Sequence, residues 1–160
     1  AADSGQKSRC LNMDPHDSLQ PGDRQTRWRV RLRDGSTTCG ISELLWISKG
    51  SFLVLERNSF AGREAKIKRV YLAKLGTATD VTSLESLASA KGSFQTMEKK
   101  LVLDLLDPKL GLAGDNFPPK WEGMAWGERG PVGRFLWLVS DNDFDHQRST
   151  WILAIQVSLP

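Results

Sequence analysis

Short runs in which polar and apolar residues alternate dominate the chain, and a period of two residues is typical of a β-strand with one apolar face. In the first run, residues 27–33, arginine occupies every second position and Trp, Val or Leu lies between. Glycine and polar turn residues separate the later runs, which cover residues 41–47, 52–55, 65–72, 100–105, 121–126, 135–140 and 151–157. These eight strands, with at most one short helix, predict an all-β, antiparallel domain.

Two segments depart from this pattern. Residues 1–26 are rich in Asp, Ser, Gly, Gln and Pro and have no sustained period, so we expect an extended N-terminal arm. Residues 76–99 are predicted to form an insertion, in which 82–87 is either a short helix capped by Ser83 or a solvated loop. The folded domain is therefore expected to span residues 27–160.

An internal repeat is the most informative feature of the sequence. Residues 40–46 align with residues 119–126, so that Glu43 matches Glu122. Each of these stretches leads through a glycine turn into a second, more apolar strand.

The two repeats also end alike. Each second strand closes with a polar cluster that contains Asn-x-Phe, at residues 56–60 and 140–144, and one more strand follows. A strand also precedes each repeat, at residues 28–33 or 101–105. Four-stranded units without interleaved helices are typical of β-propeller blades, although a β-sandwich with similar hairpins is the alternative. We therefore predict a partial β-propeller of two to three blades, with too few blades to close a ring alone.

Composition narrows the class of protein only a little. With 160 residues, 39% of them hydrophobic, the chain has the length and composition of a soluble, single-domain protein. No apolar run approaches the roughly 20 residues that cross a bilayer, so no membrane span is expected. A net charge of +3 is too small to indicate a nucleic-acid partner. The arginines at 27–33 are interpreted as the solvent side of an edge strand or as a docking surface for an acidic partner.

The two cysteines bear on the cellular compartment. A disulfide between Cys10 and Cys39 would favour a secreted, periplasmic or lumenal protein, whereas two separate buried thiols would carry no such information. The first residues, Ala1-Ala2-Asp3, lack an initiator Met and are expected at a processed end.

Five short motifs, in order, resemble the phytase-like family known as "esterase-like activity of phytase". They are ISELL at 41–45, FLVLER at 52–57, KLVLDL at 100–105, WEGMAWG at 121–127 and LVSDNDF at 138–144. The resemblance runs over residues 40–157 and corresponds to the C-terminal part of the family. It implies an extracytoplasmic hydrolase of carboxylic or phosphate esters.

The hairpin geometry predicts where the polar residues of both repeats meet. The start of one antiparallel strand lies beside the end of the next, so these side chains should share one rim of the domain. Carboxylate and amide oxygens suit Ca²⁺, but such residues also satisfy loop N–H groups. The candidate metal ligands are Glu43, Glu56, Glu122, Asp141 and Asn142, and Arg57 is the candidate partner within the chain for these carboxylates.

No conventional catalytic constellation accompanies these residues. The sequence has no nucleophile elbow and no zinc or phosphate-loop motif. His146 could serve as a base or ligand, but we expect it to be an exposed loop residue. The tryptophans fall mostly on apolar faces of predicted strands and are expected in the core or between blades: Trp28, Trp46, Trp121, Trp126, Trp137 and Trp151.

Two functions remain open at this point. One is an ester or phosphoester hydrolase that uses Ca²⁺ if the predicted ligands meet, and whose catalytic residues the sequence does not identify. The other is a non-catalytic structural or accessory subunit of a larger complex. In both cases a second chain, or a second copy of this one, is expected to cover the open face of the incomplete propeller.

Overall fold

The computed structural model describes residues 29–31, 38–81 and 94–159. The expected arm at residues 1–26, Cys10 and the ambiguous segment at 82–87 lie outside the described residues. The base of the expected insertion lies within them, where Thr79 N donates to Gln95 O and Gln95 N donates to Thr79 Oγ1.

The described chain forms strands and two short 3₁₀ turns. The strands are β1 (Arg29–Arg31), β2 (Thr38–Ser48), β3 (Ser51–Arg57), β4 (Lys68–Lys74), β5 (Glu98–Asp104), β6 (Lys120–Gly130), β7 (Gly133–Asp141) and β8 (Ile152–Val157). The turns are η1 (Gly62–Glu64) and η2 (Pro108–Leu110). Each predicted run of alternating residues coincides with one strand, although the ends differ by a few residues, and residues 27–28 and 32–33 of the first run lie outside the described part.

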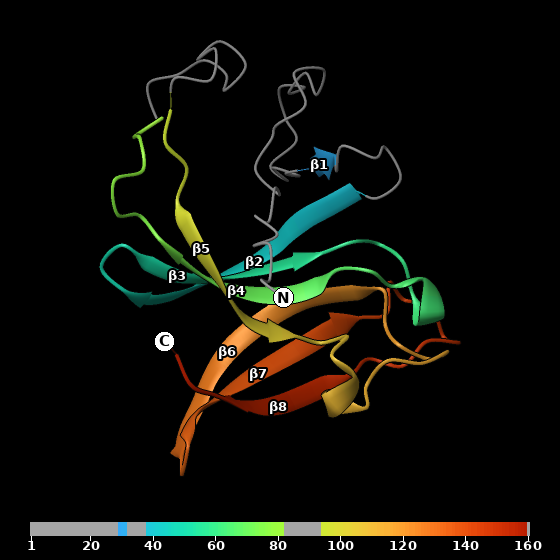
Figure 1. Ribbon diagram of the computed structural model, residues 1–160. Helices are drawn as coiled ribbons and strands as arrows, with labels where there is room; N and C mark the ends of the chain where they lie inside the picture. Colours follow the sequence, from blue (N-terminus) through green and yellow to red (C-terminus); the bar gives the residue numbers. More distant parts are fainter. Residues whose placement is uncertain (1–28, 32–37, 82–93, 160) are drawn as a thin grey trace, which may run out of the picture.

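The strands form two antiparallel sheets (Figure 1). The larger sheet, sheet A, follows chain order from β1 to β5, and the smaller one, sheet B, from β6 to β8. Consecutive antiparallel strands need only short connections, which is why each sheet is a simple meander. The prediction of an all-β, antiparallel fold is confirmed, and the two sheets are consistent with part of a propeller.

One strand lies in a different sheet from the one expected. Residues 101–105 were expected to open the second repeat, but β5 pairs with β4 at the edge of sheet A, with Val70 opposite Leu103. The long loop from Leu105 to Pro119 then leads to the other sheet. Each repeat therefore begins at its glutamate-bearing strand, β2 or β6, and β5 is the fourth strand of the first repeat.

The core lies between the two sheets. Sheet A contributes Leu53, Leu55, Val70 and Leu72, and these side chains form its core face. Sheet B contributes a matching core face, made of Trp121, Met124, Leu136, Leu138 and Val157. We call the opposite side of each sheet its open face; in sheet B it contains the partly exposed Trp137 and Val139, whereas in sheet A its centre, at Val54 and Tyr71, is buried.

The strand registers show how the repeats correspond. In both hairpins two pairs are followed by a bulge, after Ile41↔Glu56 in sheet A and after Trp121↔Ser140 in sheet B. The bulged residues are Ser42 and Glu122, so Glu43 does not occupy the position equivalent to Glu122 as the sequence alignment suggested. A bulge adds a residue to one strand and moves the register by one, which an alignment by residue type does not detect.

The tryptophans divide between the core and the surface. Trp121 is fully buried, and Trp126 and Trp151 pack against the core as expected. Trp46 and Trp137, however, are 63% and 45% exposed, because both belong to open faces. The expectation of core packing is wrong for these two residues, and Trp28 lies outside the described part.

Candidate functional site

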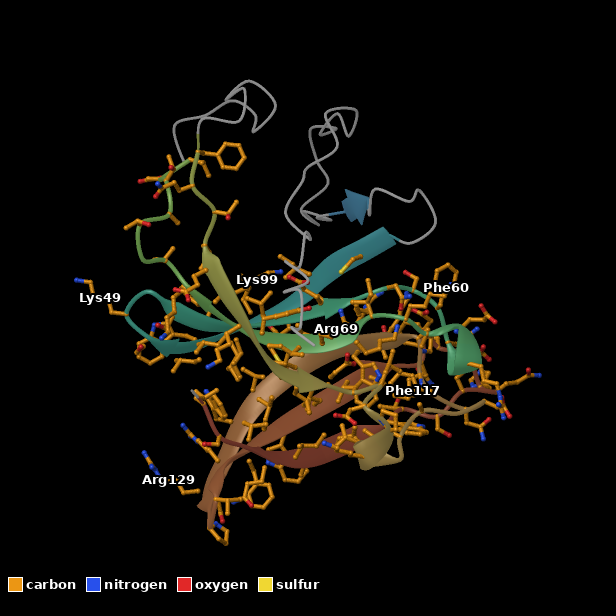
Figure 2. The ribbon with its side chains drawn as sticks, viewed as in Figure 1. Lys49, Phe60, Arg69, Lys99, Phe117 and Arg129 are labelled. Carbon is orange, nitrogen blue, oxygen red and sulfur yellow. The ribbon has the colours of Figure 1, made fainter. Side chains whose placement is uncertain are left out.

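The polar residues of both repeats meet at one end of the molecule, where the loops after β3 and β7 and the segment before β6 gather. We call this the loop end and define it as segments 58–67, 115–119 and 142–151. Figure 2 shows Phe60 and Phe117 at this end, far from Lys49 in the β2–β3 turn and from Arg129 at the end of β6. The backbone N–H of Gly62 donates to Phe117 O at 2.8 Å and joins the two nearest segments.

Lys68 is the central cation of the loop end. Its side chain is fully buried, and Nζ donates to Asn58 O, Asn58 Oδ1, Phe60 O and Pro119 O at 2.6 to 3.0 Å. Burial first, and then repulsion from Arg57, lower the pKa of Lys68 from 10.5 to about 7. Because Pro119 immediately precedes β6, this ammonium ties sheet A to sheet B.

Arg57 and Glu122 make a second connection between the sheets. Arg57 Nη2 pairs with Glu122 Oε1; the Arg57 side chain is largely shielded from water, and that of Glu122 is 35% exposed. The predicted pairing of Arg57 with a carboxylate is thus confirmed for Glu122, but not for Glu43 or Glu56, which have other partners. Beside this pair, the bulged Ser42 donates from Oγ to Trp121 O at 2.8 Å, so that the bulges of β2 and β6 are in direct contact.

Glu56 lies on the open face of sheet A, away from Glu122. Its carboxylate is fully buried and forms an ion pair with Lys99, whose ammonium also lies 4.5 Å from the centre of the Tyr71 ring. Cys39 is buried nearby, with Sγ 4.0 Å from Glu56 Oε2. Because Cys10 is outside the described residues, the pairing of Cys10 with Cys39 stays a prediction.

Asp141 and Asn142 organise the loop after β7. Asp141 Oδ1 accepts the backbone N–H of Asp143 at 2.9 Å, and Asn142 Oδ1 accepts that of Phe144 at 3.2 Å. These side-chain acceptors support the left-handed conformations of Asp143 and Phe144, whose φ angles are 55° and 58°. His146 lies exposed in the same loop.

The five predicted metal ligands do not converge on one point. Glu56 pairs with Lys99, Glu122 pairs with Arg57, and Glu43 accepts the N–H of Leu44 at 2.8 Å. Within residues 38–81 and 94–159, no three His, Cys, Asp or Glu side chains are grouped closely enough to hold a metal ion. As arranged here, the set does not fit a shared Ca²⁺ ion, and calcium binding stays a prediction.

A cavity of about 510 Å³ opens at the loop end, on the side of sheet B. Phe117, Pro118, Pro119 and Trp151 supply its apolar wall, and Trp151 packs edge-on against Phe117. Its polar lining is contributed by Asp115, Asn116, Asp141, Gln147, Arg148 and Ser149. Arg148 donates from Nε to Asp145 Oδ2 at 3.0 Å, while its side chain remains half exposed.

Several buried donors near the loop end have no acceptor among the described residues. They are Arg57 Nε, Asn58 Nδ2 and Trp121 Nε1. A buried N–H group without an acceptor costs about 1–3 kcal/mol, so such groups favour a bound water molecule or an oxygen-bearing ligand.

Sequence reasoning located part of this site and missed the rest. It identified Arg57, Glu122, Asp141 and Asn142, but not Lys68, Lys99 or Arg148. A usable signal existed for Lys68, because it stands two residues before Val70 and four before Leu72, on the side of β4 that faces the core.

Comparison with known families completes the description. A family model described as phytase-like, "esterase-like activity of phytase", matches residues 1–144. The match starts at the first residue and ends at residue 144, so it corresponds to the main part of the chain and corrects the expectation of a C-terminal resemblance limited to residues 40–157. No curated protein and no solved structure matches the chain significantly. Among the described residues, no helix is long and apolar enough to cross a membrane.

Proposed function

This chain belongs to the phytase-like family, and on that premise we propose that it hydrolyses carboxylic or phosphate esters at the cavity of the loop end. The observation that carries the proposal is the composition of the cavity, where a cation and a carboxylate, Arg148 and Asp141, line one hollow beside an apolar wall. Ligand sites commonly combine an apolar lining with a few placed polar groups.

The lining residues supply the groups that ester hydrolysis needs. The half-exposed guanidinium of Arg148 can hold an anionic ester group and stabilise the negative charge that develops on oxygen. The exposed Asp141 carboxylate can accept a proton from an attacking water molecule. Asn116 and Gln147 offer further hydrogen bonds to substrate oxygens, and Trp151 offers a surface for its carbon atoms.

Hydrolysis of chromogenic esters tests this assignment. We expect the purified full chain to release p-nitrophenol from p-nitrophenyl phosphate or p-nitrophenyl butyrate, and Arg148→Ala and Asp141→Asn to lower kcat/KM by at least about tenfold. Arg129→Ala, at the distant hairpin end, is the matched control and should keep full activity. Equal activity of all four proteins would refute the cavity as the site.

The same assay tests calcium dependence, which we propose only as a property of the assembled domain. Activity is measured after chelation and again after Ca²⁺ is restored. A loss and recovery with Ca²⁺ supports the proposal, and identical rates contradict it. No step of the hydrolysis above is assigned to the metal, since the predicted ligands do not converge among the residues that the structure describes.

We further propose that the two sheets are blades of a partial propeller and that the protein works outside the cytoplasm. Support for the first part comes from the matched registers of β2–β3 and β6–β7. The location outside the cytoplasm rests on the predicted disulfide between Cys10 and Cys39. Thiol counting on the natively isolated protein tests it, and two reactive thiols under denaturing conditions would contradict it.

A non-catalytic role is the second candidate. It is favoured by the ion pairs of Glu56 and Glu122, which are engaged by Lys99 and Arg57 in holding the fold together. In that case the chain is an accessory subunit whose open faces bind a partner chain or copy. Absence of hydrolysis by a folded protein, with and without Ca²⁺, would favour this role over the first.

A further inference from the structure

Strand β8 forms the outer edge of sheet B (Figure 1). In sheet A the corresponding strand, β4, pairs with one strand more, β5, from Arg69↔Asp104 to Lys74↔Glu98. Among the residues that the structure describes, no strand pairs with β8 on its outer side. By comparison with the first repeat, this edge is the position of a fourth strand.

The edge of β8 lacks the features that usually prevent strands from pairing. Natural edge strands are protected by charges, prolines or bulges. The β8 sequence, ILAIQV, has no charge and no proline, and it pairs with β7 without a register shift. The other edges that the structure describes are different, because β5 combines charged residues with a bulge, β1 carries two arginines and β6 has two bulges. The edge of β8 is therefore the one best suited to receive a strand.

The register shows which backbone groups of β8 point outward. Ser140 N donates to Trp151 O at 2.9 Å, and hydrogen-bonded pairs in an antiparallel ladder recur at every second residue. The odd-numbered residues from Leu153 to Val157 therefore turn their N–H and C=O groups toward β7. The even-numbered residues turn theirs outward, where no backbone group of the described residues reaches them. These residues are Ile152, Ala154 and Gln156.

The side chains along this edge are apolar and incompletely covered. On the open face, Ile152 is 67% exposed and Ala154 is exposed as well. On the core side, Leu153 and Ile155 pack against the core but are only partly buried. Opposite residues of an antiparallel pair have Cβ atoms about 4.5–5.5 Å apart on the same side of the sheet. An added strand would thus cover side chains on both faces of β8.

A second copy of β8 satisfies all the outward groups at once. These groups are symmetric about Ala154, so a two-fold axis there places Ala154 opposite its own copy and Ile152 opposite Gln156 of the other copy. Every outward N–H then meets an outward C=O. On the core side, Leu153 meets Ile155 of the other copy. A register shifted by two residues leaves groups at both strand ends without partners.

We propose that two copies of this chain pair through β8, antiparallel and about a two-fold axis at Ala154. The two B sheets then form one continuous sheet, with three strands from each copy. The contact is isologous, since the same residues meet on both sides, and it closes after two copies. It leaves Trp137, on the open face, uncovered. The pairing goes beyond the ester hydrolysis proposed above and does not depend on it.

Opposite charges at Ala154 give a direct test. Ala154→Lys and Ala154→Glu each place like charges face to face across the two-fold axis, which opposes pairing. The position is exposed, so the fold should be retained, as checked by circular dichroism. We expect light scattering at micromolar concentration to give a dimer for the unaltered chain and association at least about tenfold weaker for each variant alone. An equimolar mixture of the two variants should dimerise again, because opposite charges then meet.

Ala125→Lys is the matched control. Ala125 lies opposite Trp137, and Trp137 opposite Ala154, so the two alanines flank the tryptophan in one row of the open face. Ala125 is exposed too but belongs to β6, so Ala125→Lys should dimerise like the unaltered chain. Loss of the dimer in this control would favour a contact through the open face and overturn the proposal. A monomeric unaltered chain, or a mixture that stays monomeric, would also overturn it.

Hydrogen exchange followed by NMR tests the pairing without relying on a variant. In the dimer the amide of Ala154 should exchange slowly, although it points away from β7, and so should those of Leu153 and Ile155, which point toward β7. In Ala154→Lys only the amide at position 154 should become fast. Fast exchange of Ala154 in the unaltered chain would overturn the proposal. So would slow exchange in a monomer, because another segment of the same chain would then cover β8.

Discussion

At the scale of single residues, cations of the chain itself hold the loop end together. Arg57 and Lys68 occupy the positions between the sheets where the sequence suggested a bound metal ion. A guanidinium and a buried ammonium meet carboxylate and carbonyl oxygens, which is the chemistry that a hard cation would otherwise supply. Stability at the loop end should then depend on these side chains rather than on added calcium.

Glu122→Gln tests this dependence. The substitution keeps the side-chain volume but removes the charge that faces the largely buried Arg57, so we expect a loss of about 1–3 kcal/mol in the free energy of unfolding. Asp143→Asn, which breaks the more exposed pair with Lys120, should cost less than about 1 kcal/mol. Urea titrations measure both, with Ca²⁺ and with chelator. A cost of Glu122→Gln that appears only with Ca²⁺ would contradict the in-chain pairing and favour the metal site.

Lys68 predicts a pH dependence. Its pKa is about 7 in the folded chain, whereas an unburied lysine such as that of the unfolded chain has a pKa of 10.5, so between these values the unfolded chain binds more protons. The free energy of unfolding should therefore rise with pH over this window and be lowest below pH 7, where the buried ammonium is fully charged. Lys68→Met removes the titrating group. From about pH 7 to about pH 10, the free energy of unfolding of the unaltered chain should rise relative to that of Lys68→Met. A difference between the two proteins that does not depend on pH would contradict the prediction.

At the scale of elements, the sequence predicted which residues form strands but not how the strands pair. Alternation is a local property that both burial and pleating impose, so every predicted run became a strand. The partner of β5 and the bulge at Ser42 depend on contacts between segments distant in sequence, and local patterns do not encode them. The Asn-x-Phe motifs were better guides, because Asn58 and Asn142 directly follow the paired ends of β3 and β7. Lys68 was missed because a charge at a core position runs against the pattern that located its neighbours.

The loop between β3 and β4 supplies a prediction at this scale. Gly62 has a φ of +54°, and a Cβ there would lie 2.8 Å from Asp115 O, within the backbone of the neighbouring segment. Gly111 has a similar φ of +63°, but a Cβ there would have no atom within 4 Å. An alanine at Gly111 therefore measures the conformational strain alone, without a clash. We expect Gly111→Ala to cost about 1 kcal/mol and Gly62→Ala distinctly more, measured by urea titration. Equal costs would mean that the close approach of the two segments does not constrain the fold.

At the scale of the whole molecule, the two sheets share one core and should unfold together. Leu136 of sheet B is fully buried in the same cluster as Leu53 and Leu55 of sheet A, and the loop end adds ion pairs between the sheets. Leu136→Ala should therefore lower the stability of both sheets by a similar amount, about 2–5 kcal/mol. In a background with Trp28→Phe and Trp46→Phe, tryptophan fluorescence follows sheet B through Trp121 and Trp126, and amide hydrogen exchange follows β3 and β4 of sheet A. The two probes should report the same transition in the unaltered chain and in Leu136→Ala. Amides of sheet A that stay protected after the fluorescence change would show that the sheets are separate folding units.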